Sequence, residues 1–129
     1  MHMPTSPSCH ILIIHDDDAF RKQLIRTLDQ KHFSVTYTAD GIEALTWLEE
    51  RVFSVVVLSV DVRGPQNLNV LEVLRDRRSN AGGEAVIVLS PPSAEVRELA
   101  RFADETLMLP VDVEHVATRA QTYCPKANA

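Results

Sequence analysis

The sequence has little of what several classes of protein require. It holds two cysteines in 129 residues, Cys9 and Cys124, and no C-x-x-C spacing, so neither a zinc site nor a disulfide-rich scaffold is indicated. No apolar run approaches the roughly 20 residues of a membrane-spanning helix. The net charge of −5 gives no basic excess for contact with nucleic-acid phosphates. These absences favour a protein that binds neither a membrane nor nucleic acid directly.

The two ends of the chain carry neither a metal-binding cysteine motif nor a signal peptide. The two cysteines lie near opposite termini, and we expect free thiols in a reducing cytoplasm, with a disulfide as the less favoured alternative. The N-terminal MHMPTSPS has no basic segment followed by an apolar one, so it is not a signal peptide. We expect a disordered leader over 1–8, one domain over 9–125 and a tail over 126–129.

What the sequence does contain is a regular alternation of two patterns. Short runs rich in Val, Ile and Leu are typical of strands that are covered on both faces. Segments with apolar residues at helical spacing separate these runs, and Ser93 and Asp112 stand where they would cap the last two helices. The predicted strands are 9–15, 34–39, 54–60, 84–90 and 105–110, and the predicted helices are 19–31, 41–51, 69–77, 94–102 and 113–123.

Strands that alternate with helices of about ten residues predict a parallel sheet with right-handed crossovers. For five strands in one domain, the usual arrangement is the doubly wound, flavodoxin-like (βα)5 fold of the α/β class, with strand order 2-1-3-4-5. Functional sites in such sheets lie at the carboxyl ends of the strands. The residues just past each apolar run are therefore the candidates for function.

Polar residues follow three of these runs. His15 and an acidic stretch follow the first, Ser59 or Asp61 ends the third, and Ser90 ends the fourth. A carboxylate at the mouth of a buried strand loses hydration, which costs free energy unless a positive charge lies beside it. The first loop, HDDDAF, has no glycine to cradle a phosphate, so a small flavodoxin-like nucleotide-binding protein is only a remote alternative.

Six segments occur in a characteristic order: ILIIHDDDAFRKQL, ADGIEALTWLEE, DVRGP, NVLEVLRD, AVIVLS and ADETLMLPVD. Together they resemble the receiver domain of bacterial two-component response regulators, over about residues 11–123. The resemblance implies a cytoplasmic module that takes a phosphoryl group from a histidine kinase onto an aspartate at the end of the third strand. In that family two acidic residues help to hold Mg²⁺, which prefers oxygen ligands. A hydroxyl and a lysine bind the phosphoryl group.

The family's acidic pair does not map cleanly onto this chain. Without a gap it falls on His15 and Asp16, and with a gap it falls on Asp16 and Asp17. Imidazole is a poor ligand for Mg²⁺. The resemblance therefore implies at most a weak magnesium site, with Asp16 and Asp61 as candidate metal ligands.

After the fourth and fifth predicted strands, this chain has only some of the residues that the family carries. Ser90 fits the position of the hydroxyl switch residue. The lysine position is Leu109, whose hydrocarbon side chain cannot pair with a phosphoryl group. The aromatic switch position, three residues earlier, is Thr106.

Two alignments compete for the phosphoacceptor. Counting forward from the second predicted helix puts Ser59 in the acceptor position and leaves Asp61 in a lengthened loop. The turn proline Pro65, four residues after Asp61, favours Asp61 instead. We lean slightly to Ser59, and both alternatives stay open.

Several of these residues also have a purely structural interpretation. Asp18 could serve as the N-cap of a helix that begins at Ala19, and His15 could be a partly buried histidine. Met108, Val111 and Val113 could form an apolar patch on the last strand and helix, with some of them in the core.

We therefore predict an atypical receiver domain that acts mainly through protein–protein contact, with its standard phosphorylation site impaired. Its partner would be a kinase, an effector domain or another regulator, or a second copy bound through the last strand and helix. It is not expected to be an enzyme beyond self-phosphorylation from a phosphodonor. The alternative is a competent receiver that accepts a phosphoryl group on Asp61 with Mg²⁺.

Overall fold

The computed structural model describes residues 9–60, 66–79 and 83–124, which form alternating strands and helices. The strands make one parallel sheet in the order β2-β1-β3-β4-β5, so the predicted flavodoxin-like α/β fold is confirmed. The elements are β1 (His10–Ile14), α1 (Asp18–Gln30), β2 (Ser34–Thr38), α2 (Gly41–Glu50), β3 (Val55–Ser59), α3 (Gln66–Ser79), β4 (Ala85–Ser90), α4 (Ala94–Leu99), β5 (Glu105–Met108) and α5 (Val113–Tyr123).

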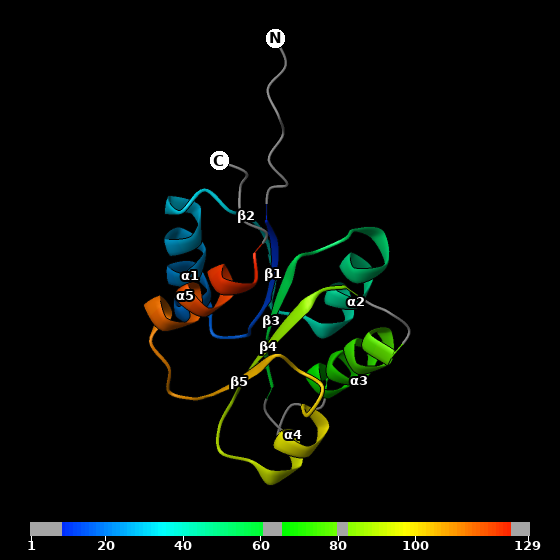
Figure 1. The fold of residues 1–129 in the computed structure, drawn as a ribbon. Coiled ribbons are helices and arrows are strands. Elements are labelled where there is room, and N and C mark those ends of the chain that lie inside the picture. The colour runs from blue at the N-terminus through cyan, green and yellow to red at the C-terminus, as the bar shows by residue number, and fades with distance from the viewer. Residues whose placement is uncertain (1–8, 61–65, 80–82, 125–129) are drawn as a thin grey trace.

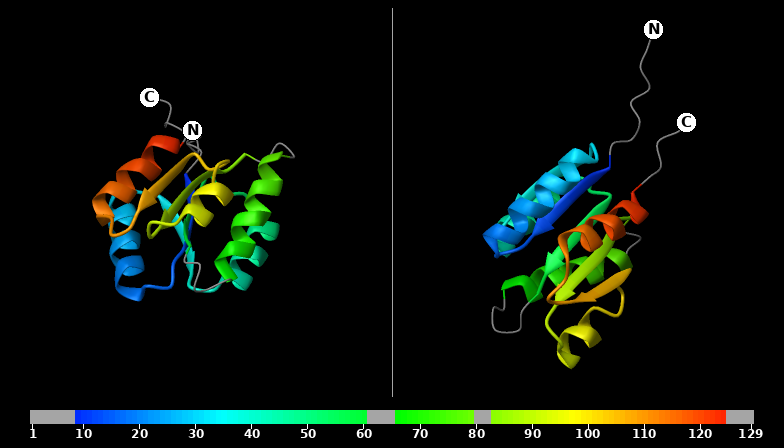
Figure 2. Two further views of the ribbon diagram at one scale, coloured as in Figure 1. Left: turned by 90° about the horizontal axis from the view of Figure 1, so that it is seen from below. Right: turned by 90° about the vertical axis from the view of Figure 1, so that its left-hand side faces the viewer.

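The sheet separates two layers of helices, with α1 and α5 on one face and α2, α3 and α4 on the other (Figures 1 and 2). Successive side chains of a strand point to opposite faces. In β1, Ile11 and Ile13 accordingly pack with α1 and α5, whereas Leu12 and Ile14 pack with the other layer. Both faces are therefore apolar, which explains why the sequence shows continuous apolar runs rather than alternation.

Helix ends follow local capping chemistry with some differences from prediction. The side chain of Ser93 accepts a hydrogen bond from the Val96 N–H at 3.2 Å, as expected of an N-cap. Asp112 occupies the N-cap of α5, but its side chain makes no capping hydrogen bond. The fourth helix ends at Leu99 rather than at 102, because Ala103 N–H turns back to the Ala100 carbonyl and Phe102 packs on the core.

The expectation of free thiols is wrong, because Cys9 and Cys124 form a disulfide with an S–S distance of 2.00 Å. The two residues are 115 positions apart, so their pairing depends on the tertiary fold and not on any local spacing. Cys9 precedes β1 and Cys124 follows α5. Both sulfurs belong to the apolar cluster between the sheet and the layer of α1 and α5.

Ion pairs fix two carboxylates beside the starts of β4 and β5. Glu84 is 4% exposed, and its carboxylate accepts hydrogen bonds from Nε and Nη2 of Arg77 at 3.1 and 2.8 Å. The carboxylate of Glu105 accepts hydrogen bonds from Nε of Arg119 at 2.9 Å and from the hydroxyl of Tyr123 at 2.7 Å. These contacts tie α3 to β4, and α5 to β5.

Within the described residues, no helix combines the length and apolarity needed to cross a membrane. The predicted leader over 1–8 and the predicted tail over 126–129 lie outside the described residues.

Candidate functional site

Four strands end side by side at the carboxyl edge of the sheet. Backbone hydrogen bonds continue the sheet pattern one step past β1, β3 and β5: His15 N–H donates to the Thr38 carbonyl, Val60 N–H to the Leu89 carbonyl, and Leu109 N–H to the Ser90 carbonyl. Because the strands are parallel, the residues at these ends share one edge. In Figure 1 this edge lies away from the two marked termini. The residues found here are His15, Ser59, Ser90 and Leu109.

His15 is buried, with 6% of its surface exposed. Its Nδ1 accepts a hydrogen bond from the Asp17 N–H at 3.0 Å, which requires an unprotonated Nδ1. Burial lowers the pKa of His15 from its ordinary value, and the carboxylates of Asp16 and Asp17 oppose this shift. The imidazole therefore serves as a neutral structural acceptor, and its Nδ1 lone pair is in use.

The three aspartates after β1 have three different environments. Asp17 is the N-cap of α1, and its Oδ1 accepts from Phe20 N–H at 3.1 Å. The predicted N-cap, Asp18, is instead the first helical residue, so that prediction is wrong by one position. Asp16 is 82% exposed at its side chain, with Oδ1 3.6 Å from His15 Nδ1.

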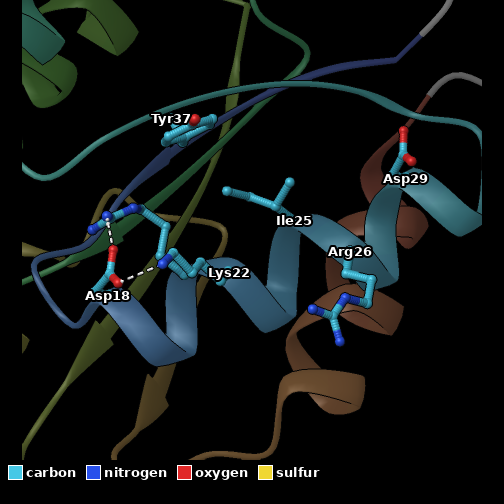
Figure 3. Close-up of a pocket in the computed structure, with 7 residues that line it drawn as sticks. Asp18, Lys22, Ile25, Arg26, Asp29 and Tyr37 are labelled. Atoms are coloured by element: carbon cyan, nitrogen blue, oxygen red, sulfur yellow. Dashed lines mark hydrogen bonds and ion pairs between the residues drawn. The ribbon is translucent and has the colours of Figure 1, made fainter.

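Asp18 lines a surface cavity of about 610 Å³ beside α1 and β2 (Figure 3). Its carboxylate pairs with Arg21 and with Lys22 Nζ at 3.0 Å. The Arg21 guanidinium also donates to the His15 carbonyl at 2.8 Å and lies 5.8 Å from the centre of the Tyr37 ring. This cation is therefore engaged by Asp18, by the end of β1 and by the Tyr37 ring.

The described donors do not fit a magnesium site. Mg²⁺ requires several hard oxygen ligands in near-octahedral geometry. Among the acidic residues after β1, Asp17 caps a helix and Asp18 pairs with two cations, which leaves Asp16 alone. In the described part of the chain, no three His, Cys, Asp or Glu side chains are grouped to hold a metal. The other candidate ligand, Asp61, lies outside the described residues.

Ser59 is the last residue of β3, and 7% of its surface is exposed. Its carbonyl accepts a hydrogen bond from Nδ2 of Asn67 in α3, at 2.6 Å. Sequence reasoning missed Asn67, and an amide in the first turn of the next helix is the signal that would have indicated it. The contact ties the end of β3 to the start of α3.

Ser90 ends β4, and its hydroxyl donates to the Pro91 carbonyl at 2.7 Å. The residue is 3% exposed. Beside it, Thr106 and Met108 are exposed on the edge strand β5. A small cavity of about 140 Å³ lies between α4 and β5, lined by Ser90, Pro91, Pro92, Ser93, Val96, Arg97, Thr106 and Met108.

Leu109 follows β5 and precedes Pro110 through a cis peptide bond. It is partly buried, and it packs against the same apolar cluster as α1 and α5. A cavity of about 380 Å³ opens between this residue and the first loop. The described residues that line it include no lysine or arginine: they are His15, Asp17, Phe20, Leu109, Pro110 and Val111.

Comparison with known proteins gives a consistent result. The profile of the response regulator receiver domain matches residues 11–119. Response regulator MprA of Mycobacterium sp. (strain KMS) is 36% identical over 112 residues, which are 84% of this chain and 47% of that protein. MprA of Mycobacterium bovis (strain BCG / Pasteur 1173P2) is 35% identical over 115 residues, 87% of this chain and 49% of that protein. The chain thus spans about half the length of these relatives.

Solved structures share the same fold. A CheY-like receiver domain protein from Methanospirillum hungatei superposes with a TM-score of 0.78 at 21% identity, covering 89% of this chain and 92% of that one. TrrA from Thermotoga maritima, in complex with Mg²⁺ and beryllofluoride, gives a TM-score of 0.72 at 19% identity, covering 89% and 98%.

Proposed function

Since the chain belongs to the response regulator receiver domain family, we propose that it is an atypical member whose standard phosphorylation site is impaired. It acts mainly by binding a signalling protein, which would be a kinase, an effector domain or another regulator. In this proposal it is a cytoplasmic module that is not an enzyme, beyond any self-phosphorylation from a phosphodonor.

The observation that carries the proposal is the cavity beside Leu109. An acyl phosphate brings additional negative charge, which needs a fixed cation in a partly dehydrated site. Leu109 instead presents hydrocarbon there, and no cation is among the described lining residues. The nearby guanidinium of Arg21 is engaged by the His15 carbonyl and Asp18.

Two further assignments belong to this proposal. Ser59 stands in the acceptor position, supported by its place as the last residue of β3 beside His15 and Ser90 at the same edge. A serine hydroxyl is a much weaker nucleophile at neutral pH than a carboxylate unless a base activates it. Ser90 is the hydroxyl switch residue, and Thr106 and Leu109 stand where the aromatic and the lysine are lost.

The edge strand β5 supports an interaction role. Met108 is 60% exposed, and Thr106 is exposed beside it. Val111 and Val113, which follow in the chain, pack partly against the core. The edge strand β5, together with α5, forms the surface that we assign to a partner or to a second copy of the chain.

The alternative function is a competent receiver that accepts the phosphoryl group on Asp61. The spacing of Asp61 to Pro65 favours it. Asp16, with or without Asp17, would then hold Mg²⁺ together with Asp61. Asp17 would have to exchange its helix-capping hydrogen bond for the metal.

Incubation with acetyl phosphate and Mg²⁺, followed by a Phos-tag gel, separates the two functions. We expect the wild-type chain to give no shifted band. A shifted band that Asp61→Ala abolishes and Ser59→Ala retains would overturn the proposal in favour of the competent receiver.

A gain-of-function variant provides the positive control. The combination of His15→Asp, Ser59→Asp and Leu109→Lys rebuilds the family's charge set at the edge, and we expect it to give a shifted band. Leu109→Lys alone should stay unmodified. If Leu109→Lys alone becomes labelled on Asp61, the acceptor assignment to Ser59 is wrong.

A further inference from the structure

The disulfide joins two distant parts of the fold at the amino edge of the sheet, opposite the candidate site. Cys9 directly precedes β1, which lies between β2 and β3. Cys124 follows α5 as its C-cap. Their Cα atoms are 5.3 Å apart, inside the range of about 4.4–6.8 Å usual for disulfides. The bond therefore ties the end of the last helix to an inner strand of the sheet.

The last turn of α5 has a second attachment that does not involve sulfur. The hydroxyl of Tyr123 donates to Oε2 of Glu105 at the start of β5, at 2.7 Å. Arg119, one turn earlier, pairs with the same carboxylate. A reduced chain therefore keeps α5 docked on β5 while it loses the covalent link to β1.

The compartment decides how such a bond is used. Thiol reductants keep most cytosolic cysteines reduced, and cytosolic disulfides of mesophiles are mainly transient, catalytic or redox-sensing. The proposed function places this chain in the cytoplasm, and the inference rests on that function for the location alone. We propose that Cys9 and Cys124 form a reversible thiol–disulfide switch that sets how firmly the end of α5 is tied to β1.

The chemistry balances with a thiol reductant, either a small-molecule thiol or a dithiol protein. A thiolate attacks Sγ of Cys124, and Cys9 leaves as a thiolate and takes up a proton. We choose Cys124 as the site of attack because this residue is 9% exposed and Cys9 is 4% exposed. A second reductant thiolate attacks the reductant sulfur of the mixed disulfide, and Cys124 leaves in the same way. Two electrons pass to the protein, and the reductant becomes a disulfide. A disulfide oxidant reverses these steps.

The consequence falls on the helix that we assign to partner binding. In the oxidised form the C-cap of α5 is covalently fixed, and its N–H is bonded to the Gln121 carbonyl at 3.1 Å. In the reduced form this turn is held by the Tyr123–Glu105 contact. The redox state of the pair therefore changes the order of the end of α5 and leaves the strands in place.

The test equilibrates the full chain in glutathione buffers with reduced-to-oxidised ratios from about 1:1 to about 1,000:1. Alkylation and mass spectrometry then give the disulfide fraction, and hydrogen exchange reports on residues 120–124. We expect conversion to the dithiol within this range, with faster exchange in the last turn of α5 and unchanged protection of β1 and β3. The thermal midpoint should fall by on the order of 10 °C on reduction.

Three results would overturn the proposal. A disulfide that persists at the highest ratio is a permanent staple, and two free thiols at the lowest ratio mean that no pair forms. Conversion without a change in exchange at 120–124 means that the pair does not control α5. None of these readouts needs a partner or a phosphodonor. Failure of this proposal can therefore be told apart from failure of the proposed function.

Two variants serve as controls. The Cys9→Ala, Cys124→Ala double variant should match the reduced wild type in every buffer, and a remaining redox response would place the switch elsewhere and overturn the proposal. Tyr123→Phe loosens the same turn without touching sulfur. It should raise exchange at 120–124 in both states and keep the dependence on the glutathione ratio.

Discussion

Carboxylates at the two edges of the sheet meet different partners. At the amino edge, Glu84 before β4 and Glu105 at the start of β5 each receive an arginine through two nitrogens. At the carboxyl edge, Asp16 is exposed beside a neutral imidazole, and Asp17 caps a helix. The difference shows that Arg77 and Arg119 are used to join a helix to a strand at the amino edge.

The same contrast explains why the carboxyl edge is a poor receptor for a phosphoryl group. Planar guanidinium groups bind carboxylates and phosphates with two parallel hydrogen bonds, and they need partners that hold them in place. Arg77 and Arg119 have such partners and are committed to them. At the opposite edge Leu109 contributes packing, with Phe20 and Val111 lining the same cavity.

The largest effect is expected from breaking the buried pair at the amino edge. Arg77→Ala leaves the Glu84 carboxylate, 4% exposed, without its bidentate partner. Removing one member of a buried ion pair costs about 3–5 kcal/mol, and partial exposure of Arg77 favours the lower end, about 3 kcal/mol. Urea unfolding measures the loss.

Arg75→Ala is the matched control on the same helix. Arg75 is 44% exposed and faces Asp76, which is 71% exposed. Such a surface pair contributes little, so the free energy of unfolding should change by less than about 0.5 kcal/mol. Equal losses from Arg75→Ala and Arg77→Ala would contradict the assigned role of Glu84.

The fold could be predicted from the sequence because its signals are local and repeated. Each apolar run marks a strand with two covered faces, and each periodic segment marks a helix, so the strand order follows from the usual doubly wound arrangement. The end of α4 could not be read in this way. The apolar spacing continues to Phe102, but that side chain reaches the core from a turn.

The candidate site was less predictable, for physical reasons. Three consecutive aspartates can each cap a helix, and the choice of Asp17 depends on the hydrogen bond of its N–H to His15. The position of Asn67 in the first turn of α3 marks it as a candidate, but its contact with the carbonyl of Ser59 is seen only in the structure. The choice between Ser59 and Asp61 stays a prediction. The disulfide partners are 115 positions apart and are brought together by the tertiary fold, so no local spacing indicates the pair.

A second, smaller effect is expected at Glu105. The side chain is 17% exposed, and hydrogen bonds from Arg119 lower the pKa of this carboxyl, with a further contribution from Tyr123. Glu105→Gln removes the charge and keeps the size. We expect a loss of about 1.5 kcal/mol at pH 7, after discounting for the solvent around the guanidinium.

The pH dependence of the free energy of unfolding tests the contact between Glu105 and Arg119. A carboxyl whose pKa is lower in the folded state than in the unfolded state contributes its full stability above the unfolded value, about 4.3 for Glu. This contribution is lost as the pH falls from there through the folded pKa. Below about pH 4 the difference between wild type and Glu105→Gln should therefore shrink. A difference that stays constant down to pH 2 would show that the charge of Glu105 is not the cause.

The smallest effect separates the two neighbouring carboxylates of the carboxyl edge. Asp17→Ala removes the N-cap of α1 and should lower the free energy of unfolding by about 1 kcal/mol. Asp16→Ala removes an exposed side chain and should change it by less than about 0.5 kcal/mol. Urea unfolding at pH 7 measures both changes in the free energy of unfolding. It is repeated with about 10 mM Mg²⁺, an excess for a weak site. Stabilisation of the wild type by Mg²⁺ that Asp16→Ala abolishes would mean that this edge does bind the metal, through the exposed carboxylate of Asp16.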